Sequence, residues 1–245
     1  MTAEAAVDSE NFQGLASANA IAPACVWQEL GVVDYQAAWD LQLEHVERLK
    51  SGVGEDRLFF LEHPHVVTFG RNGKDENLLA SRDQLARLGV QYCETDRGGD
   101  VTYHGPGQLV CYPIMDLKRW KRDVGAYLRA LEEVLIRTLA DYGIEGRRDS
   151  GATGVWVSEA KVAAMGIHLS RWVTSHGFAL NVTTDLDYFR HIVPCGLTRP
   201  VTSLTKLLGE APDITELRAR LIGYFGTVFG REMIPGGTDR IEKGS

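Results

Sequence analysis

The chain has 245 residues, of which 44% are hydrophobic and 24% are charged, and its formal net charge is -7. This composition is ordinary for a globular protein and supplies enough apolar side chains for a sizeable core. The acidic balance argues against a dedicated nucleic-acid-binding protein, which normally carries a basic excess. No apolar run approaches the roughly 18 residues that a membrane-spanning helix needs, so we expect no membrane segment.

The two ends of the chain differ from its middle. Residues 1–24 are rich in Ala, Ser, Glu and Asn and lack the basic start and apolar run of a secretory signal. We expect a flexible extension there, a single domain over residues 25–234, and a loose polar tail over residues 235–245. The four cysteines include no C-x-x-C pair, which argues against a zinc site and predicts reduced thiols in a cytoplasmic protein. The seven histidines show no H-x-x-x-H or H-E-x-x-H pattern, so we expect no metal.

Hydrophobic periodicity and capping residues predict the elements in chain order. Strands are expected over residues 26–31, 58–61, 66–69, 90–95, 101–104, 109–114, 154–157, 161–169 and 177–182. Helical segments are expected over residues 34–49, 83–88, 123–142, 186–191 and 213–229. Strands outnumber helices and do not alternate regularly with them. This order favours an α/β fold of the α+β type, with a mixed sheet flanked by helices, over a doubly wound parallel sheet.

The most distinctive segment reads R-G-G-D-V-T-Y-H-G-P-G-Q over residues 97–108. Glycine allows positive φ angles and close approach of the backbone to a ligand, so four glycines beside two strand-like runs indicate a tight turn or a ligand site. The segment also holds a cation at Arg97, a carboxylate at Asp100 and an imidazole at His104. The alternative is an ordinary hairpin with a polar turn.

Two residues further along could supply nucleophilic chemistry. Cys195 lies between Pro194 and Gly196, which predicts a thiol on a tight bend rather than on a packed helix. Such a thiol needs a nearby cation or base to become a thiolate. Lys161 precedes the almost uncharged run V-A-A-M-G-I, where partial desolvation would make its amine a plausible base. The alternatives are an inert cysteine and an exposed lysine at the start of a strand.

The remaining candidates are weaker. His104 and His176 either line a ligand slot or are satisfied structural histidines. The charged stretch K-R-W-K-R over residues 118–122 is either a docking patch for an acidic protein or a solvated face.

Taken together, six motifs resemble those of the lipoyl(octanoyl) transferases, the octanoyl-acyl-carrier-protein:protein N-octanoyltransferases. They are, in family order, R-G-G-D-V-T-Y-H-G-P-G-Q at 97–108, G-V-W-V at 154–157, K-x-x-x-x-G at 161–166, H-G-F-A-L-N at 176–181, P-C-G at 194–196 and V-T-S-L at 201–204. The resemblance covers about residues 26 to 230, and no motif position departs from it. It implies a fold shared with lipoate and biotin protein ligases.

The resemblance also implies an activity and its residues. An octanoyl group would pass from octanoyl-acyl carrier protein to a lysine of lipoyl domains, in 2-oxoacid dehydrogenase E2 subunits and the glycine cleavage H protein. Cys195 and Lys161 match the catalytic pair, which needs no cofactor. The acyl slot would be lined by Arg97, Gly98, Gly99, Asp100, Val101, Thr102, Tyr103, His104, Ala164, Met165, Gly166, Gly177, Phe178 and Ala179. We expect a monomer with no nucleic-acid or membrane partner.

Three other functions remain open at this stage. An ATP-dependent lipoate or biotin ligase would use the same fold without a thiol nucleophile. A cysteine hydrolase or amidase would release free acid, with His104 or His176 as its base. A non-enzymatic acyl-binding domain would sequester the carrier protein and would not need Cys195 or Lys161.

Overall fold

The computed structural model describes residues 22–193 and 199–237, so Cys195 lies outside the described residues. The larger sheet has the strand order β10-β1-β2-β6-β9-β8-β7. Its strands are β1 (Ala24–Val32), β2 (Asp56–Glu62), β6 (Gln108–Ile114), β7 (Val155–Val157), β8 (Ala160–Ser170), β9 (Val173–Asn181) and β10 (Glu232–Pro235). β1 runs parallel to β10 and to β2, whereas the pairs from β2 through β6, β9, β8 and β7 are antiparallel. The predicted mixed sheet is confirmed.

A smaller sheet of three strands accompanies it, in the order β4-β3-β5. Its strands are β3 (Val66–Phe69), β4 (Gln91–Glu94) and β5 (Val101–His104). β5 carries the first strand-like run of the glycine-rich segment, and β6 of the larger sheet carries the second. The two strands on either side of the Gly105–Gly107 turn therefore belong to different sheets and do not form the ordinary hairpin that was the alternative interpretation. The turn carries the chain from one sheet to the other.

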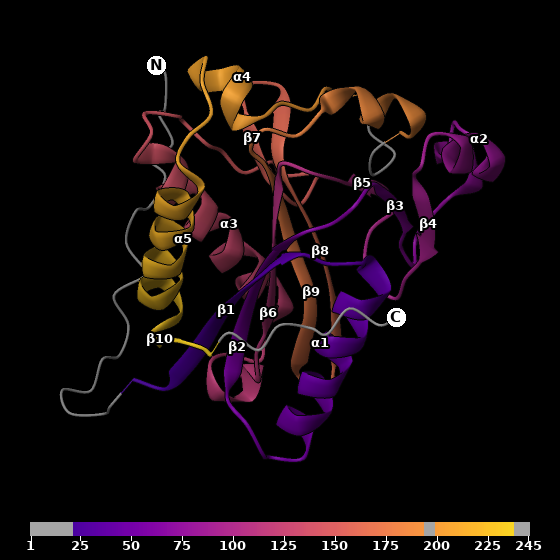
Figure 1. Cartoon of the computed structure of the whole chain (residues 1–245). Coiled ribbons are helices and arrows are strands. Elements are labelled where there is room, and N and C mark those ends of the chain that lie inside the picture. The colour runs from indigo at the N-terminus through magenta and orange to yellow at the C-terminus, as the bar shows by residue number, and fades with distance from the viewer. Residues whose placement is uncertain (1–21, 194–198, 238–245) are drawn as a thin grey trace, which may run out of the picture.

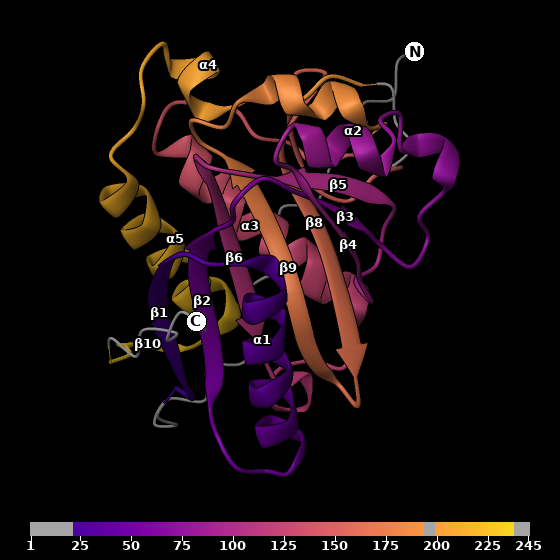
Figure 2. The same ribbon diagram turned by 45° about the vertical axis from the view of Figure 1, so that its right-hand side comes forward.

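Helices cover both faces of the larger sheet (Figure 1, Figure 2). The helices α3 (Val124–Ala140) and α5 (Ile214–Phe229) pack together on one face, around the largest apolar core. The helix α1 (Tyr35–Lys50) packs on β6 and β9 from the other face. Two covered faces explain why every residue of β6 and β9 is buried, since the central strands of a three-layer fold have no solvated side.

Local chemistry sets the ends of the long helices, which lie close to their predicted positions. Asp34, Asp123 and Asp213 each accept hydrogen bonds from backbone N–H groups of the first turn and so cap α1, α3 and α5. Gly230 ends α5 in a left-handed conformation with φ of 61°. The shorter helical segments are α2 (Arg82–Arg87), α4 (Leu204–Leu208) and the 3₁₀ turns η1 (Asp75–Asn77), η2 (Leu117–Arg119) and η3 (Leu186–His191). No described helix has the length and apolar character to cross a membrane.

Several features differ from the prediction, which included neither β10 nor the turns η1 and η2. β9 begins at Val173 rather than at the predicted residue 177. The Thr174 hydroxyl accepts from Met115 N and donates to the Pro113 carbonyl, so this polar residue is hydrogen-bonded within the sheet. α4 was not predicted. The first residues of the tail expected to be loose continue along β1: Pro235 ends β10, Gly236 N donates to the Trp27 carbonyl at 2.8 Å, and the Gly237 carbonyl accepts from Gln28. The rest of that tail, residues 238–245, lies outside the described residues. A segment with few apolar side chains can pair with β1 because backbone hydrogen bonds are enough to add it to the edge of the sheet.

Candidate active site

The site is a slot whose floor is a block of small residues on the larger sheet. Val110 of β6 pairs with Ala179 of β9, which in turn pairs with Ala164 of β8. Two positions along, on the same face, Gly177 pairs with Gly166. Because two alanines and two glycines stand where larger side chains would otherwise fill the layer, the sheet is hollowed there.

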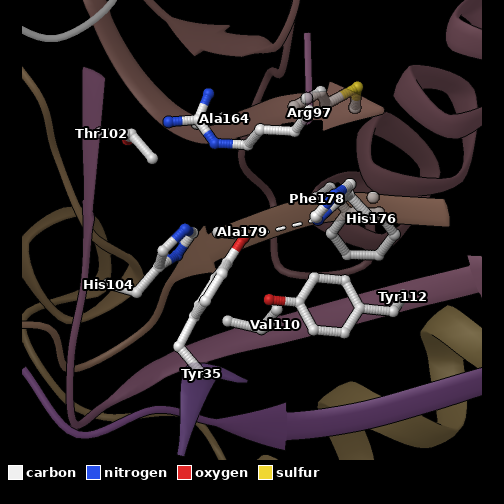
Figure 3. Close-up of a pocket in the computed structure, with 13 residues that line it drawn as sticks. Tyr35, Arg97, Thr102, His104, Val110, Tyr112, Ala164, His176, Phe178 and Ala179 are labelled. Carbon is white, nitrogen blue, oxygen red and sulfur yellow. Dashed lines mark hydrogen bonds between the residues drawn. The ribbon is translucent and has the colours of Figure 1, made fainter. Parts of the chain in front are cut away.

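Other segments roof this hollow. Thr102 and His104 reach it from β5 of the smaller sheet, Tyr35 from the start of α1, and Arg97 from the glycine-rich loop (Figure 3). Together with the sheet they line one pocket. Most of its surface is apolar, because the polar groups around it are already engaged with one another, as described below.

The loop from Arg97 to Asp100 is held by its neighbours. The Arg97 guanidinium donates to the Thr68 carbonyl at 2.6 Å and to the Thr68 hydroxyl, and Gly98 N donates to the Ile167 carbonyl at 2.8 Å. A Cβ on Gly166 would lie 2.7 Å from the Gly98 carbonyl oxygen. The glycine at 166 is therefore required by the crossing of this loop, whereas the sequence had suggested that a ligand chain lies against it.

Nine of the expected slot residues line this one pocket. They are Arg97, Thr102, His104, Ala164, Met165, Gly166, Gly177, Phe178 and Ala179. Gly98 and Gly99 line an adjoining pocket together with Lys161, Leu128 and residues 151–153. The two pockets share Met165 and Gly166 of β8.

The other three expected residues, Asp100, Val101 and Tyr103, point elsewhere. The Asp100 carboxylate accepts from the backbone N–H groups of Lys74 and Val101 and from the Asn77 amide, which fixes the loop rather than a ligand. Val101 and Tyr103 belong to a separate core beneath the smaller sheet. Successive side chains of a strand face opposite sides, so only Thr102 and His104 of β5 can face the slot. These three residues are therefore not among those that line either pocket.

Lys161 lies at the start of β8 and is 7% exposed. Its ammonium donates to the Thr153 carbonyl at 3.2 Å and lies 4.8 Å from the centre of the Trp156 ring. A small cavity joins Lys161 to Thr102 and Ala164, both of which also line the slot. Lys161 thus lines a small cavity that shares two of its residues with the slot.

The chain on either side of Cys195 reaches this neighbourhood. The Pro200 carbonyl accepts from the Lys161 backbone N–H at 2.9 Å, and Thr202 N donates back to the Lys161 carbonyl at 2.9 Å. On the other side, Val193 N donates to the Asn77 carbonyl at 2.8 Å, and the Asn77 side chain contacts Asp100. Residues 194–198, which include Cys195, lie outside the described residues.

Two histidines of the slot are held neutral. Burial lowers the pKa of His104 well below its ordinary value, and its Nδ1 lies 2.7 Å from the Gln108 side-chain oxygen. Burial also lowers the pKa of His176, although the Asp96 carboxylate 2.7 Å from its Nε2 works in the opposite direction. Both histidines are therefore hydrogen-bonded, and both also line the slot. Each thus combines the structural role and the slot-lining role that the sequence had offered as alternatives.

Sequence reasoning missed three lining residues, Tyr35, Val110 and Tyr112. Val110 and Tyr112 could have been found from strand alternation starting at Gln108, whereas nothing local marks Tyr35. The charged stretch over residues 118–122 follows the far end of β6, away from the Gly105–Gly107 turn, and Lys118 and Arg119 are paired with Asp116.

Comparison with solved structures first defines the class of fold. Lipoate-protein ligase A bound with ATP superimposes with a TM-score of 0.67 at 17% identity, covering 89% of this chain and 90% of that one. A bi-partite lipoate protein ligase from Thermoplasma acidophilum superimposes with a TM-score of 0.66 at 17% identity, covering 89% of each chain. The fold is that of the lipoate protein ligases.

Sequence comparison then gives the family. Residues 34–226 match the lipoyl protein ligase A/B catalytic domain. The octanoyltransferase of Solibacter usitatus is 58% identical over 212 residues, covering 86% of this chain and 96% of that protein. The octanoyltransferase of Flavobacterium johnsoniae is 44% identical, covering 84% of this chain and 97% of its own. The chain therefore belongs to the lipoyl protein ligase A/B catalytic-domain family.

Proposed function

We propose that this protein is an acyltransferase that moves an octanoyl group from octanoyl-acyl carrier protein to a lysine of lipoyl domains, in E2 subunits and the glycine cleavage H protein. The relatives of 44–58% identity are octanoyltransferases, and the apolar slot with an amine beside it suits an acyl chain whose reacting carbonyl lies at Lys161. This reaction is the first step of protein lipoylation by endogenously made octanoyl groups. We further propose that it takes place in the cytoplasm, and the described cysteines are free thiols, as a reducing compartment requires.

In our mechanism Lys161 takes the proton of the Cys195 thiol, and the thiolate attacks the carbonyl carbon of the incoming thioester. A new C–S bond forms to Cys195, the C–S bond to the carrier breaks, and the carrier leaves as a thiol with the proton from Lys161. One thioester replaces another, so the exchange is nearly balanced and needs no ATP. The lysine amine of the lipoyl domain then attacks the octanoyl-Cys195 thioester, so that a C–N bond forms and the C–S bond to Cys195 breaks. Lys161 takes the proton of the amine and returns it to the departing Cys195 thiolate. The amide formed is more stable than the thioester, which draws the second step forward.

The observation that carries the proposal is the position of Lys161. Lys161 lines a small cavity beside the slot, and its backbone is hydrogen-bonded to Pro200 and Thr202, a few residues after Cys195. Two of the described cysteines are poor nucleophiles, because burial raises the pKa of Cys25 and of Cys111 well above the ordinary thiol range. We therefore infer that the amine of Lys161 acts on the Cys195 thiol.

The test is an intact-mass spectrum after incubation with octanoyl-acyl carrier protein, without ATP or acceptor. We expect an octanoyl adduct that maps to Cys195 and discharges onto an added lipoyl domain. Cys195→Ser should abolish transfer. Cys93→Ser is the matched control, because Cys93 is a partly exposed cysteine on β4 outside the slot, and its loss should leave the adduct in place.

Two results would contradict the proposal. Full transfer by Cys195→Ser would remove the acyl-cysteine route. Modification that appears only with ATP and free octanoate would make the protein a ligase, while release of free octanoate without any need for an acceptor would make it a hydrolase.

A further inference from the structure

The end of the slot away from Lys161 is made of two phenols and three imidazoles. Tyr35 and Tyr112 line it together with His176 (Figure 3), and the rings of His63 and His104 lie 5.0 and 5.9 Å from the Tyr35 ring. All five side chains are buried. Such a concentration of polar groups is unexpected at the blind end of a slot for a hydrocarbon chain, unless their polar atoms are occupied elsewhere.

The Tyr112 hydroxyl is committed to His63. His63 Nδ1 lies 2.7 Å from the Val33 carbonyl oxygen, and because a carbonyl only accepts, Nδ1 carries the proton. Burial lowers the pKa of His63 to about 4, so at neutral pH its Nε2 has no proton and accepts from the Tyr112 hydroxyl at 2.7 Å. Tyr112 is therefore fixed from behind and directs its proton out of the slot.

The Tyr35 hydroxyl is directed in the same way. His176 Nε2 lies 2.7 Å from the Asp96 carboxylate and donates to it, which leaves Nδ1 as the acceptor 3.4 Å from the Tyr35 hydroxyl. His176 has a φ of 57°, which is uncommon for a residue with a side chain. Its backbone N–H is bonded to Gln42 of α1 at 2.7 Å, so this conformation is fixed by the helix above it.

We propose that Tyr35 and Tyr112 form a rigid wall that ends the acyl slot and so sets the length of the transferred chain. Each phenol is held by a neutral histidine that is itself anchored to the backbone or to Asp96, so neither ring can swing aside for a longer chain. The hydroxyl protons point into the histidines, which leaves ring carbon facing the terminal methyl group. This inference rests on the proposed octanoyl transfer and goes beyond it.

Competition between chain lengths tests the wall. The enzyme is offered equimolar hexanoyl, octanoyl, decanoyl and dodecanoyl carrier protein, and the distribution of acyl adducts is read by intact mass. Tyr35→Ala and Tyr112→Leu should raise the decanoyl-to-octanoyl ratio roughly tenfold or more, since each methylene in an apolar pocket discriminates by about that factor. Tyr35→Phe keeps the ring but loses its hydrogen bond to His176, so the ratio should rise less than in Tyr35→Ala.

Ala179→Val tests the opposite direction. Ala179 lies in the floor between Val110 and Ala164, so added methyl groups there should shift the distribution toward hexanoyl. Tyr103→Ala is the matched control. Tyr103 is also a buried tyrosine whose hydroxyl bonds a histidine, here His65 at 2.8 Å, but it faces away from the slot. Its loss should leave the chain-length ratio unchanged whatever it does to stability.

The outcomes separate the two proposals. If the wild type forms no octanoyl adduct, the proposed function is wrong and the wall falls with it. If the wild type forms the adduct but Tyr35→Ala and Tyr112→Leu keep its ratio, the wall does not set chain length. Should thermal unfolding find both variants unfolded, Tyr35→Phe decides: a larger share of decanoyl adduct supports a wall held by the hydrogen bond to His176, and an unchanged distribution overturns it.

Discussion

Gly166 illustrates at the scale of one residue how a motif glycine can serve the protein's own backbone. The Gly98 carbonyl and the Arg97 side chain occupy the space where a Cβ would stand, at 2.7 and 3.2 Å. The glycine lets the loop that carries Arg97 cross the floor of the slot at hydrogen-bonding distance from Ile167. A motif position that lines a pocket can thus also be required by the packing of the protein's own backbone.

We therefore expect Gly166→Ala to lower the free energy of unfolding by about 1–3 kcal/mol, the usual cost of overpacking, and to reduce transfer by displacing the loop. Urea unfolding and the rate of adduct formation measure the two effects. Gly223→Ala is the control, because Gly223 lies within α5 with no atom within 4 Å of a Cβ. It should stabilise the protein by about 0.5–1 kcal/mol. A Gly166→Ala variant as stable and active as the wild type would contradict the packing argument.

At the scale of elements, a buried ion pair ties the C-terminal strand to the sheet. Arg231 Nε, just before β10, donates to the Asp56 carboxylate of β2 at 2.9 Å, and Arg231 also donates to the Phe229 carbonyl at the end of α5. The other Asp56 oxygen accepts from Asp116 N, beyond the end of β6. The pair thus joins three elements that are distant in sequence.

Removing the cation alone should be costly. Burial raises the pKa of Asp56 even with Arg231 present, so Arg231→Met would leave a carboxylate buried without its main partner. We expect the free energy of unfolding to fall by about 3–5 kcal/mol, measured by urea denaturation at pH 7. Arg220→Met, which breaks exposed pairs with Asp141 and Glu216, should have a much smaller effect. Equal losses in the two variants would show that burial does not decide the value of the pair.

At the scale of the whole molecule, buried neutral histidines predict acid lability. Burial lowers the pKa of His63 to about 4, and it also lowers those of His104 and His176. Below about pH 6.5 the unfolded chain binds protons that the folded protein excludes, so acid favours unfolding.

The free energy of unfolding should therefore be greatest above about pH 6.5 and fall toward pH 4, with up to about 3 kcal/mol of the loss from His63 alone. Urea unfolding at a series of pH values measures the slope. His63→Gln should lose less over this range, whatever its stability at pH 7. If His63→Gln leaves the pH dependence of the free energy of unfolding unchanged, His63 binds its proton equally well in the folded and the unfolded protein.

Much of the architecture follows from local patterns in the sequence. The aspartate caps and apolar stripes of α1, α3 and α5 act within a few residues, so the helices were predicted close to their observed bounds. The ordered motifs identified the family and the candidate residues, and nine of the fourteen slot residues meet in one pocket. The roles of Cys195 and Lys161 remain predictions that the mass-spectrometric test addresses.

The sequence by itself determined the helices, the mixed-sheet class, the family and the set of residue types available for chemistry. Only the tertiary structure decided which of them face the slot. Strand alternation directs Thr102 inward and Tyr103 outward, Asp100 binds its own loop, and β10 joins β1 from the far end of the chain. The tertiary structure also brought Tyr35 and Tyr112 together in the lining of the slot. The reason is physical: a helix is stabilised within its own turns, whereas a sheet face and a pocket depend on partners that local patterns do not specify.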